Sequence, residues 1–182
     1  MKKIIKQKGF TLVETLVAIS ILMISVTGPI YYASESLKAA VYARDQITAF
    51  YLAQDAFEQI RKIRDDNIYG PGPSWDVGLT GCQILCRVNT NGLFYSIDVV
   101  TPLNNENKYL YKNNTNGIYS HNTTNGTKTI FQRTVRIEPM DGDPSGSWDK
   151  ATEMKVTVMV DWNSRGVSRN FTAYEFLRRL NK

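Results

Sequence analysis

Few residues of this chain have the types and spacing that catalysis or ligand binding requires. The only thiols are those of Cys82 and Cys86, and the only imidazole is that of His121. Outside the cytoplasm two cysteines are expected to form a disulfide, and two free buried thiols are the alternative. A disulfide needs Cα atoms within about 7 Å, whereas residues four apart in a straight strand lie about 13 Å apart. Ile84 and Leu85 must therefore lie in a tight turn, a bulge or a helical turn if the bond forms.

The sequence does not predict a catalytic site. His121 lies in residues 113–129, which are rich in Asn, Thr and Gly and which we interpret as a surface loop. A catalytic Cys–His pair would need a free thiol close to this ring. A zinc site is not expected, because one histidine and two cysteines are too few for its usual ligands. There is no phosphate-binding glycine loop, no Gly-x-Ser-x-Gly elbow and no two-histidine metal motif. We therefore expect no enzymatic activity and no required cofactor.

Glu14 is the only charged residue in the apolar run of residues 10–33. An ionised side chain at the centre of a membrane costs at least about 2.5 kcal/mol, so such residues usually have a partner and a function. The run is long enough to cross a bilayer as a helix, because about 20 residues span the hydrocarbon. It departs from a secretory signal, since no Ala-x-Ala-like site follows it. Four lysines precede Gly9 and predict a cytoplasmic N-terminus with the rest of the chain outside: Lys2, Lys3, Lys6 and Lys8.

The hexapeptide from Gly9 to Glu14, Gly-Phe-Thr-Leu-Val-Glu, closely resembles the type III signal of type IV pilins and type II secretion pseudopilins. The resemblance implies that a membrane prepilin peptidase cuts after Gly9 on the cytoplasmic side and then methylates the new amine of Phe10. It also implies that Glu14 pairs with the N-terminal amine of a neighbouring subunit during assembly. The alternative is an uncleaved signal anchor that carries one isolated glutamate.

Charge accounting argues against a nucleic-acid-binding body. The chain of 182 residues carries a formal net charge of +5 and has a pI of about 9.2. Residues 1–9, the predicted leader, hold four of the five net positive charges, so the mature chain would be close to neutral. We infer no specific nucleic-acid partner.

The elements that position these residues begin with one long helix. Residues 34–68 continue the apolar run with strong helix formers and contain no glycine or proline. Gly28 and Pro29 predict a kink or local melting, because proline removes one backbone hydrogen bond. A stripe at three- and four-residue steps is expected to be covered: Leu37, Ala40, Ile47, Phe50, Ala53, Phe57, Ile60 and Ile63. Charged residues away from it are expected to face solvent or partners: Asp45, Asp55, Glu58, Arg61 and Lys62.

Beyond residue 70 the helical periodicity gives way to alternation, which predicts strands. The clearest strand is Met154 to Trp162, followed by a turn at residues 163–166 and a last segment from Val167 to Leu180. Four further strands are expected at residues 83–88, 93–101, 108–112 and 129–138. An antiparallel sheet packed on the second half of the helix would cover the stripe. The predicted fold class is therefore α+β, the layout that the pilin resemblance also implies.

The resemblance extends more weakly beyond the signal. Residues 51–64 are similar to a helix of minor pilins, with Asp55 in place of a Glu. Major pilins more often carry a C-terminal disulfide loop, whereas both cysteines here are central, which favours a minor pilin or pseudopilin. Some pseudopilins bind calcium, and the oxygen-rich segment with Asp141, Asp143 and Asp149 could hold it. Its spacing does not match an EF-hand, and the same composition is ordinary for turns.

Together these features predict four segments: a leader (1–9), a transmembrane and filament-core helix (10–33), its amphipathic continuation (34–68) and a β-rich extracytoplasmic domain (69–182). The expected function is that of a minor pilin-like structural subunit. The alternatives are a pseudopilin of a type II secretion or DNA-uptake system, and a membrane-anchored binding protein that never polymerises. The expected partners are other pilin subunits, the prepilin peptidase, membrane lipid and the inner-membrane assembly platform. The expected location is the bacterial inner membrane, then a surface pilus or periplasmic pseudopilus.

Overall fold

The computed structural model describes residues 9–70, 74–90, 95–99, 108–140 and 151–179. Helix α1 (Leu12–Tyr69) is followed by strands that form one antiparallel sheet, so the predicted α+β class is confirmed. The chain divides into two compact units between Arg44 and Asp45. The division falls inside α1, and the boundary expected at residues 33 and 34 stays a prediction.

The first unit contains the apolar part of α1. An 18-residue window of the helix has a mean hydropathy of 1.9, and none of it is buried within the structure. Length and composition therefore suit a membrane-crossing helix. The helix runs through Gly28 and Pro29 without a break, so the expected local melting is wrong, whereas a kink there stays a prediction.

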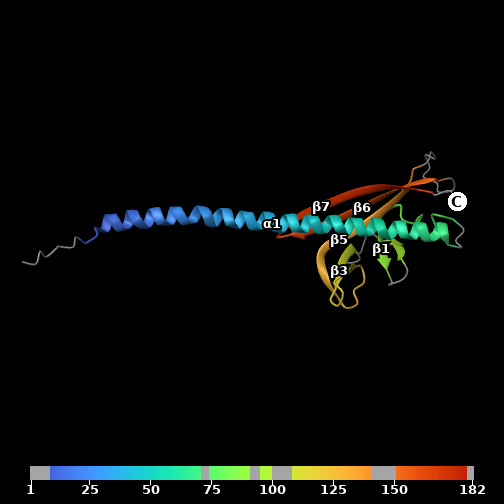
Figure 1. Ribbon diagram of the computed structural model, residues 1–182, viewed down its shortest axis with the longest axis horizontal. Helices are drawn as coiled ribbons and strands as arrows, with labels where there is room; N and C mark the ends of the chain where they lie inside the picture. Colours follow the sequence, from blue (N-terminus) through green and yellow to red (C-terminus); the bar gives the residue numbers. More distant parts are fainter. Residues whose placement is uncertain (1–8, 71–73, 91–94, 100–107, 141–150, 180–182) are drawn as a thin grey trace, which may run out of the picture. The chain divides into compact units, whose positions relative to one another are not determined.

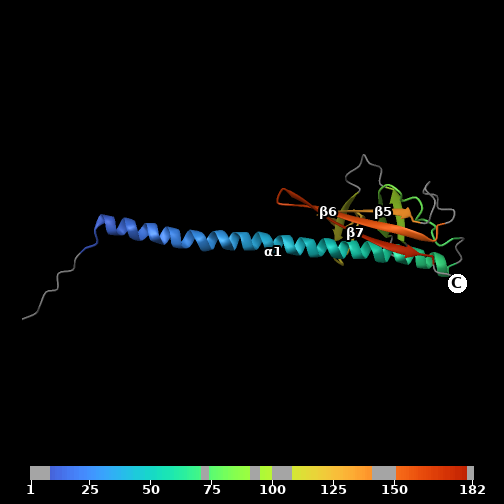
Figure 2. The same ribbon diagram turned by 90° about the horizontal axis from the view of Figure 1, so that it is seen from above.

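The second unit contains a seven-stranded sheet among the described residues. β5 (Gly126–Pro139) is its central strand, and one edge of β5 pairs with β1 (Cys86–Thr90) and β3 (Tyr109–Asn113). The other edge pairs with β6 (Glu153–Ser164), which pairs with β7 (Val167–Arg178). The remaining strands are β2 (Tyr95–Val99), beside β1, and β4 (Tyr119–Ser120), beside β3. Figures 1 and 2 show residues 45–69 of α1 along one face of β5, β6 and β7.

The hairpin of β6 and β7 is the most regular part of the sheet. Ser164 pairs with Val167, so Arg165 and Gly166 form a two-residue turn with φ angles of 54° and 82°. Two positive φ angles define the turn that matches the twist of the strands, and glycine adopts this conformation without strain. The turn predicted at residues 163–166 is confirmed.

The core lies between α1 and the inward face of the sheet. On β6 this face consists of alternating buried side chains, as predicted: Met154, Val156, Val158, Val160 and Trp162. On α1 the buried face consists mainly of small and aliphatic residues: Ala49, Leu52, Ala53, Ala56, Phe57 and Ile60. Their spacing of three and four residues places them on one side of the helix.

The predicted stripe was therefore correct in its second half and wrong in its first. Ala53, Phe57 and Ile60 are buried, whereas Ile47 and Phe50 are exposed. Residues 45–60 carry two apolar faces, and the prediction merged them. Asp45, which we expected at the surface, is buried because it precedes Ala49 by four residues and shares its face.

A disulfide joins Cys82 to Cys86, the first residue of β1, with a Cα–Cα distance of 5.6 Å. The chain bends at residues 83 and 84, which fits the compact geometry that the bond requires. Both cysteines are buried, and the carbonyl of Cys82 accepts a hydrogen bond of 2.7 Å from the Ile137 N–H. The bond therefore fixes the approach of β1 to the central strand.

Candidate processing and assembly site

The residues of the predicted cleavage site lie immediately before α1. Gly9 and Phe10 are exposed and are not part of the helix, and 79% of the Phe10 surface is accessible. A Cβ atom at Gly9 would meet no atom within 4 Å. The described part of the protein therefore places no steric restriction on a side chain at this position.

Thr11 is the N-cap of α1. Its Oγ1 accepts a hydrogen bond of 3.2 Å from the Glu14 backbone N–H, and its carbonyl accepts one of 3.1 Å from the Thr15 N–H. Such caps satisfy N–H groups that have no partner in the first turn. Threonine followed by glutamate three residues later is the capping-box pattern, so the helix begins at a position encoded next to the Gly9–Phe10 peptide bond.

Glu14 occupies the third helical position and is exposed. A carboxylate in the first turn interacts favourably with the positive end of the helix dipole. Glu14 therefore has two roles. Its backbone N–H donates to the capping side chain, and its carboxylate is exposed at the start of the apolar segment.

Four serine and threonine hydroxyl groups of the apolar segment differ from the Glu14 carboxylate because they are satisfied within the helix. Each donates to a backbone carbonyl three or four residues earlier, at 2.7–2.8 Å: Thr15, Ser20, Ser25 and Thr27. Polar groups paired in this way are compatible with lipid. The carboxylate of Glu14 is thus the group that most needs a partner outside the helix.

A polar network joins α1 to the sheet in the second unit. Arg133 of β5 is almost fully buried, and its Nη1 donates to the Leu52 carbonyl at 2.9 Å and to the Asp55 carboxylate at 2.6 Å. Gln59 donates to the same carboxylate oxygen at 2.7 Å. Burial lowers the pKa of Arg133, and the Asp55 carboxylate opposes this effect.

A second ion pair joins α1 to the last strand. Arg61 donates two hydrogen bonds to the Glu175 carboxylate, at 2.8 Å from Nε and 2.7 Å from Nη2. The hydrogen bond to Glu175 raises the pKa of Arg61, and the paired geometry orients both side chains. Asp55 and Arg61, which we expected to face solvent or partners, are half-exposed and also form ion pairs within the chain.

The other residues that the sequence offered for chemistry are His121, the two cysteines and the aspartates of a possible calcium site. Our interpretation of residues 113–129 as a surface loop is correct for residues 114–118 and 122–125, which lie outside the strands and are mostly exposed. It is wrong for His121, which is buried and whose Nδ1 lies 3.1 Å from the Tyr109 carbonyl. That segment contains β4 and the start of β5, and tertiary packing overrides its polar composition. The disulfide leaves neither cysteine as a thiolate. In the described ranges no group of three or more His, Cys, Asp or Glu residues could hold a metal ion. Asp141, Asp143 and Asp149 lie outside those ranges, and calcium binding there stays a prediction.

The sequence analysis missed two residues that hold α1 in place, Arg133 and Thr11. Arg133 lies on the inward face of β5 among apolar residues, and a charged residue at such a position in a strand could have indicated a buried ion pair. Thr11 was missed as a cap although the Thr-x-x-Glu spacing was present.

Comparison with known proteins finds a match, which lies in the N-terminal segment. A family model described as the prokaryotic N-terminal methylation motif matches residues 4–28. The chain therefore carries a type IV pilin-like prepilin signal. No curated protein and no solved structure matches the chain.

Proposed function

We propose that this protein is a minor pilin-like structural subunit of a type IV pilus-type filament. A prepilin peptidase cuts the chain between Gly9 and Phe10 and methylates the Phe10 amine, and the subunit then assembles through α1. We assign it a structural and not an enzymatic role. The observation that carries the proposal is the match to the methylation motif at residues 4–28, which spans the exposed residues Gly9 and Phe10 and the start of a capped apolar helix.

The assembly step follows from the chemistry of the first unit. In the membrane the apolar side chains of α1 contact lipid, and in a filament they contact neighbouring helices. Because this exchange is apolar for apolar, packing and polar pairing decide the register. Glu14 paired with the Phe10 amine of a neighbour leaves two paired charges in place of two unpaired ones.

The alternative within the class is a pseudopilin of a type II secretion or DNA-uptake system. The central position of the cysteines supports a minor subunit of either kind, and the phenotype of a deletion separates them. Secretion loss would favour the pseudopilin, and loss of surface filaments would favour the pilin.

The decisive experiment is mass spectrometry of the N-terminus of the protein isolated from cells that contain a prepilin peptidase. We expect a chain that starts at N-methylated Phe10, and an intact leader in cells without the peptidase. A mature protein that retains Met1 in peptidase-containing cells would overturn the proposal and favour the membrane anchor.

Gly9 provides the matched control. Gly9→Ala is expected to reduce the cleaved fraction and Gly9→Val to abolish cleavage, while the amount of membrane-inserted precursor stays unchanged. The vacant space around Gly9 means that neither variant disturbs the described fold. Full cleavage of Gly9→Val would contradict the processing step.

A further inference from the structure

The apolar segment at the start of α1 is bounded by aromatic residues at both ends. Residues 11–30 contain no Phe, Tyr or Trp, whereas Phe10 precedes them and Tyr31 and Tyr32 follow them. These 20 residues extend about 30 Å as a helix, which equals the thickness of the hydrocarbon core of a bilayer. The spacing of the aromatic residues therefore matches the distance between the two polar faces of a membrane.

Tyr31 and Tyr32 form an exposed pair on the first unit. They expose 63% and 74% of their surface, and their ring centroids lie 6.0 Å apart with the ring planes at 75°. Neighbouring helical residues project about 100° apart, so the two rings cover adjacent sides of α1. A tyrosine ring has an apolar body and a polar hydroxyl group, which suits the boundary between hydrocarbon and headgroups.

The first charged residue after the tyrosine pair is Glu35, which forms an ion pair of 2.6 Å with Lys38. Only Ala33 and Ser34 separate the tyrosine pair from Glu35, which is less than one helical turn. Charged side chains are costly in hydrocarbon. The tyrosine pair and then the ion pair thus form two successive limits to how far this end of α1 can enter the membrane.

The leader lysines at the other end of the segment are less precise markers of depth. Their long side chains can reach a membrane face from several depths, so they fix the orientation of α1 better than its position along the membrane normal. The depth of the helix must therefore be set at its other end.

We infer that Tyr31 and Tyr32 bind the headgroup layer on the side of the membrane opposite the leader, and that they set the depth of α1. That depth also decides where the Gly9–Phe10 peptide bond lies relative to the cytoplasmic face. The anchor depends only on the apolar helix and its boundaries. Its role in positioning the bond for cleavage rests on the proposed function.

Cysteine labelling measures the depth in cells without prepilin peptidase, where the full chain stays a membrane-bound precursor. Ser34→Cys and Ile30→Cys place one thiol on either side of the tyrosine pair, and the native cysteines are joined in a disulfide. A membrane-impermeant maleimide added to spheroplasts is expected to label Ser34→Cys and to leave Ile30→Cys unlabelled.

Removal of both rings should change this pattern. Tyr31→Ala combined with Tyr32→Ala is expected to abolish the labelling of Ser34→Cys, because the helix can then sink by about one turn until Glu35 reaches the interface. Tyr31→Trp combined with Tyr32→Trp is expected to keep the labelling, since tryptophan is also enriched at membrane interfaces.

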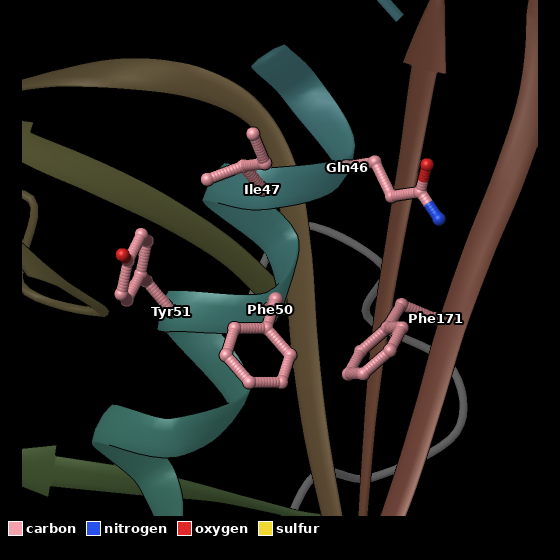
Figure 3. Close-up of a pocket in the computed structure, with 5 residues that line it drawn as sticks. All are labelled: Gln46, Ile47, Phe50, Tyr51 and Phe171. Carbon is pink, nitrogen blue, oxygen red and sulfur yellow. The ribbon is translucent and has the colours of Figure 1, made fainter. Parts of the chain in front are cut away.

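Tyr51→Ala is the matched control. Tyr51 has the same exposed fraction as Tyr31, 63%, but it belongs to the second unit. Figure 3 shows its ring pointing away from Phe171 of β7. Its removal is expected to leave the labelling of Ser34→Cys unchanged.

Reconstitution tests whether lipid is the partner. The purified precursor is placed in phosphatidylcholine vesicles at a ratio that leaves most vesicles with no more than one chain. The difference between the tyrosine and the double-alanine forms is expected to persist there. If the difference disappears, a neighbouring protein and not the headgroup layer holds the tyrosines, and the inference is overturned.

The effect on processing is measured by pulse-chase in cells that contain the peptidase. The double-alanine variant is expected to be cleaved at least about tenfold more slowly, because a misplacement of about 1 Å at a reacting centre can cost about a hundredfold in rate. The tryptophan variant is expected to be cleaved at the wild-type rate.

The outcomes separate the inference from the function on which its second part rests. Unchanged labelling of Ser34→Cys in the double-alanine variant would overturn the anchor. A shifted labelling pattern with an unchanged cleavage rate would overturn its role in positioning the bond. A wild-type chain that shows the expected labelling but is never cleaved would overturn the proposed function and leave the anchor in place.

Discussion

At the scale of single residues, one position carries two separable properties. The backbone N–H of Glu14 donates to the cap residue Thr11 at the start of α1, and the Glu14 carboxylate is the only charge in the apolar run of residues 10–33. The capping-box pattern at the start of a helix accepts glutamine as well as glutamate at this position. Ionic pairing with an amine requires the charge. Substitutions can therefore distinguish the two.

We expect Glu14→Gln to keep leader cleavage and the start of α1 but to reduce incorporation into filaments at least about tenfold, since it removes a charge-assisted contact of about 1.5–3 kcal/mol. Glu14→Ala should have the same effect on incorporation and should also weaken the helix start. Immunoblots of sheared filaments, normalised to processed subunit in the membrane, measure this. Incorporation of Glu14→Gln at the wild-type level would show that assembly does not depend on the charge.

At the scale of elements, α1 is attached to the sheet by polar contacts as well as by the core. Arg133 reaches from the inward face of β5 to Leu52 and Asp55, and Glu175 of β7 holds Arg61. A buried guanidinium is costly without its partners, so the network constrains where α1 can lie on the sheet. The consequence is that the two partners in the Arg133–Asp55 pair should not be equivalent in mutagenesis.

Asp55→Ala is expected to lower the free energy of unfolding by about 2–3 kcal/mol, because it leaves Arg133 buried without its carboxylate. Arg133→Met should cost less, since an apolar side chain replaces the buried charge and Asp55 is half-exposed. Thermal unfolding of the full chain in detergent measures both. The surface pair of Arg136 and Glu138 supplies the control, and Glu138→Ala should change stability by less than about 1 kcal/mol. Equal effects of Asp55→Ala and Glu138→Ala would argue against the tether.

The disulfide is the second device that fixes an element. Replacing both Cys82 and Cys86 by alanine is expected to lower the free energy of unfolding by about 2 kcal/mol, the chain-entropy value for so short a loop. A reducing agent should destabilise the wild-type chain to the same extent and leave the double variant unchanged. A wild-type chain that is insensitive to reductant under unfolding conditions would contradict this prediction.

At the scale of the whole molecule, the side chains of the two units suit different surroundings, lipid for the first unit and water for the second. The first is apolar over the length of a bilayer and follows a lysine-rich leader, whereas the second buries a mixed helix–sheet core. Charge asymmetry across an apolar segment sets its orientation. The leader should therefore stay in the cytoplasm and the second unit should lie outside.

We expect protease added to spheroplasts of cells without prepilin peptidase to degrade the second unit while an N-terminal tag remains protected. Permeabilising the membrane should expose the tag. Replacing the four leader lysines by glutamine should increase the inverted fraction, because the positive charges that retain the N-terminus are lost. A tag that is accessible in intact spheroplasts would refute the orientation.

Much of this organisation could be predicted from periodicity. The long helix, the inward face of Met154 to Trp162 and the turn at Arg165 and Gly166 depend on local patterns that the structure confirms. The signal was predictable because its residues are contiguous.

The errors and the contacts that were not predicted occur where residues distant in the sequence meet in the structure. On an isolated helix Asp55 and Arg61 look like surface charges. Their partners come from strands that follow 78 and 114 residues later in the sequence. His121 is buried although its neighbours in sequence are polar. The two apolar faces of residues 45–60 could not be separated without knowing which one the sheet covers.

The ion pair of Arg61 and Glu175 has a consequence for the order in which the protein folds during its synthesis. Arg61 and Glu175 are 114 residues apart, and β7 also provides Leu177 to the core. At about 5–20 residues per second, between about 6 and 23 s pass before translation reaches the strand that completes the cover of α1. For that interval β5 and β6 can already cover part of the aliphatic face of the helix, whereas the part that β7 covers stays open. Because β7 is the last strand, the core can close only after nearly all of the chain has been synthesised.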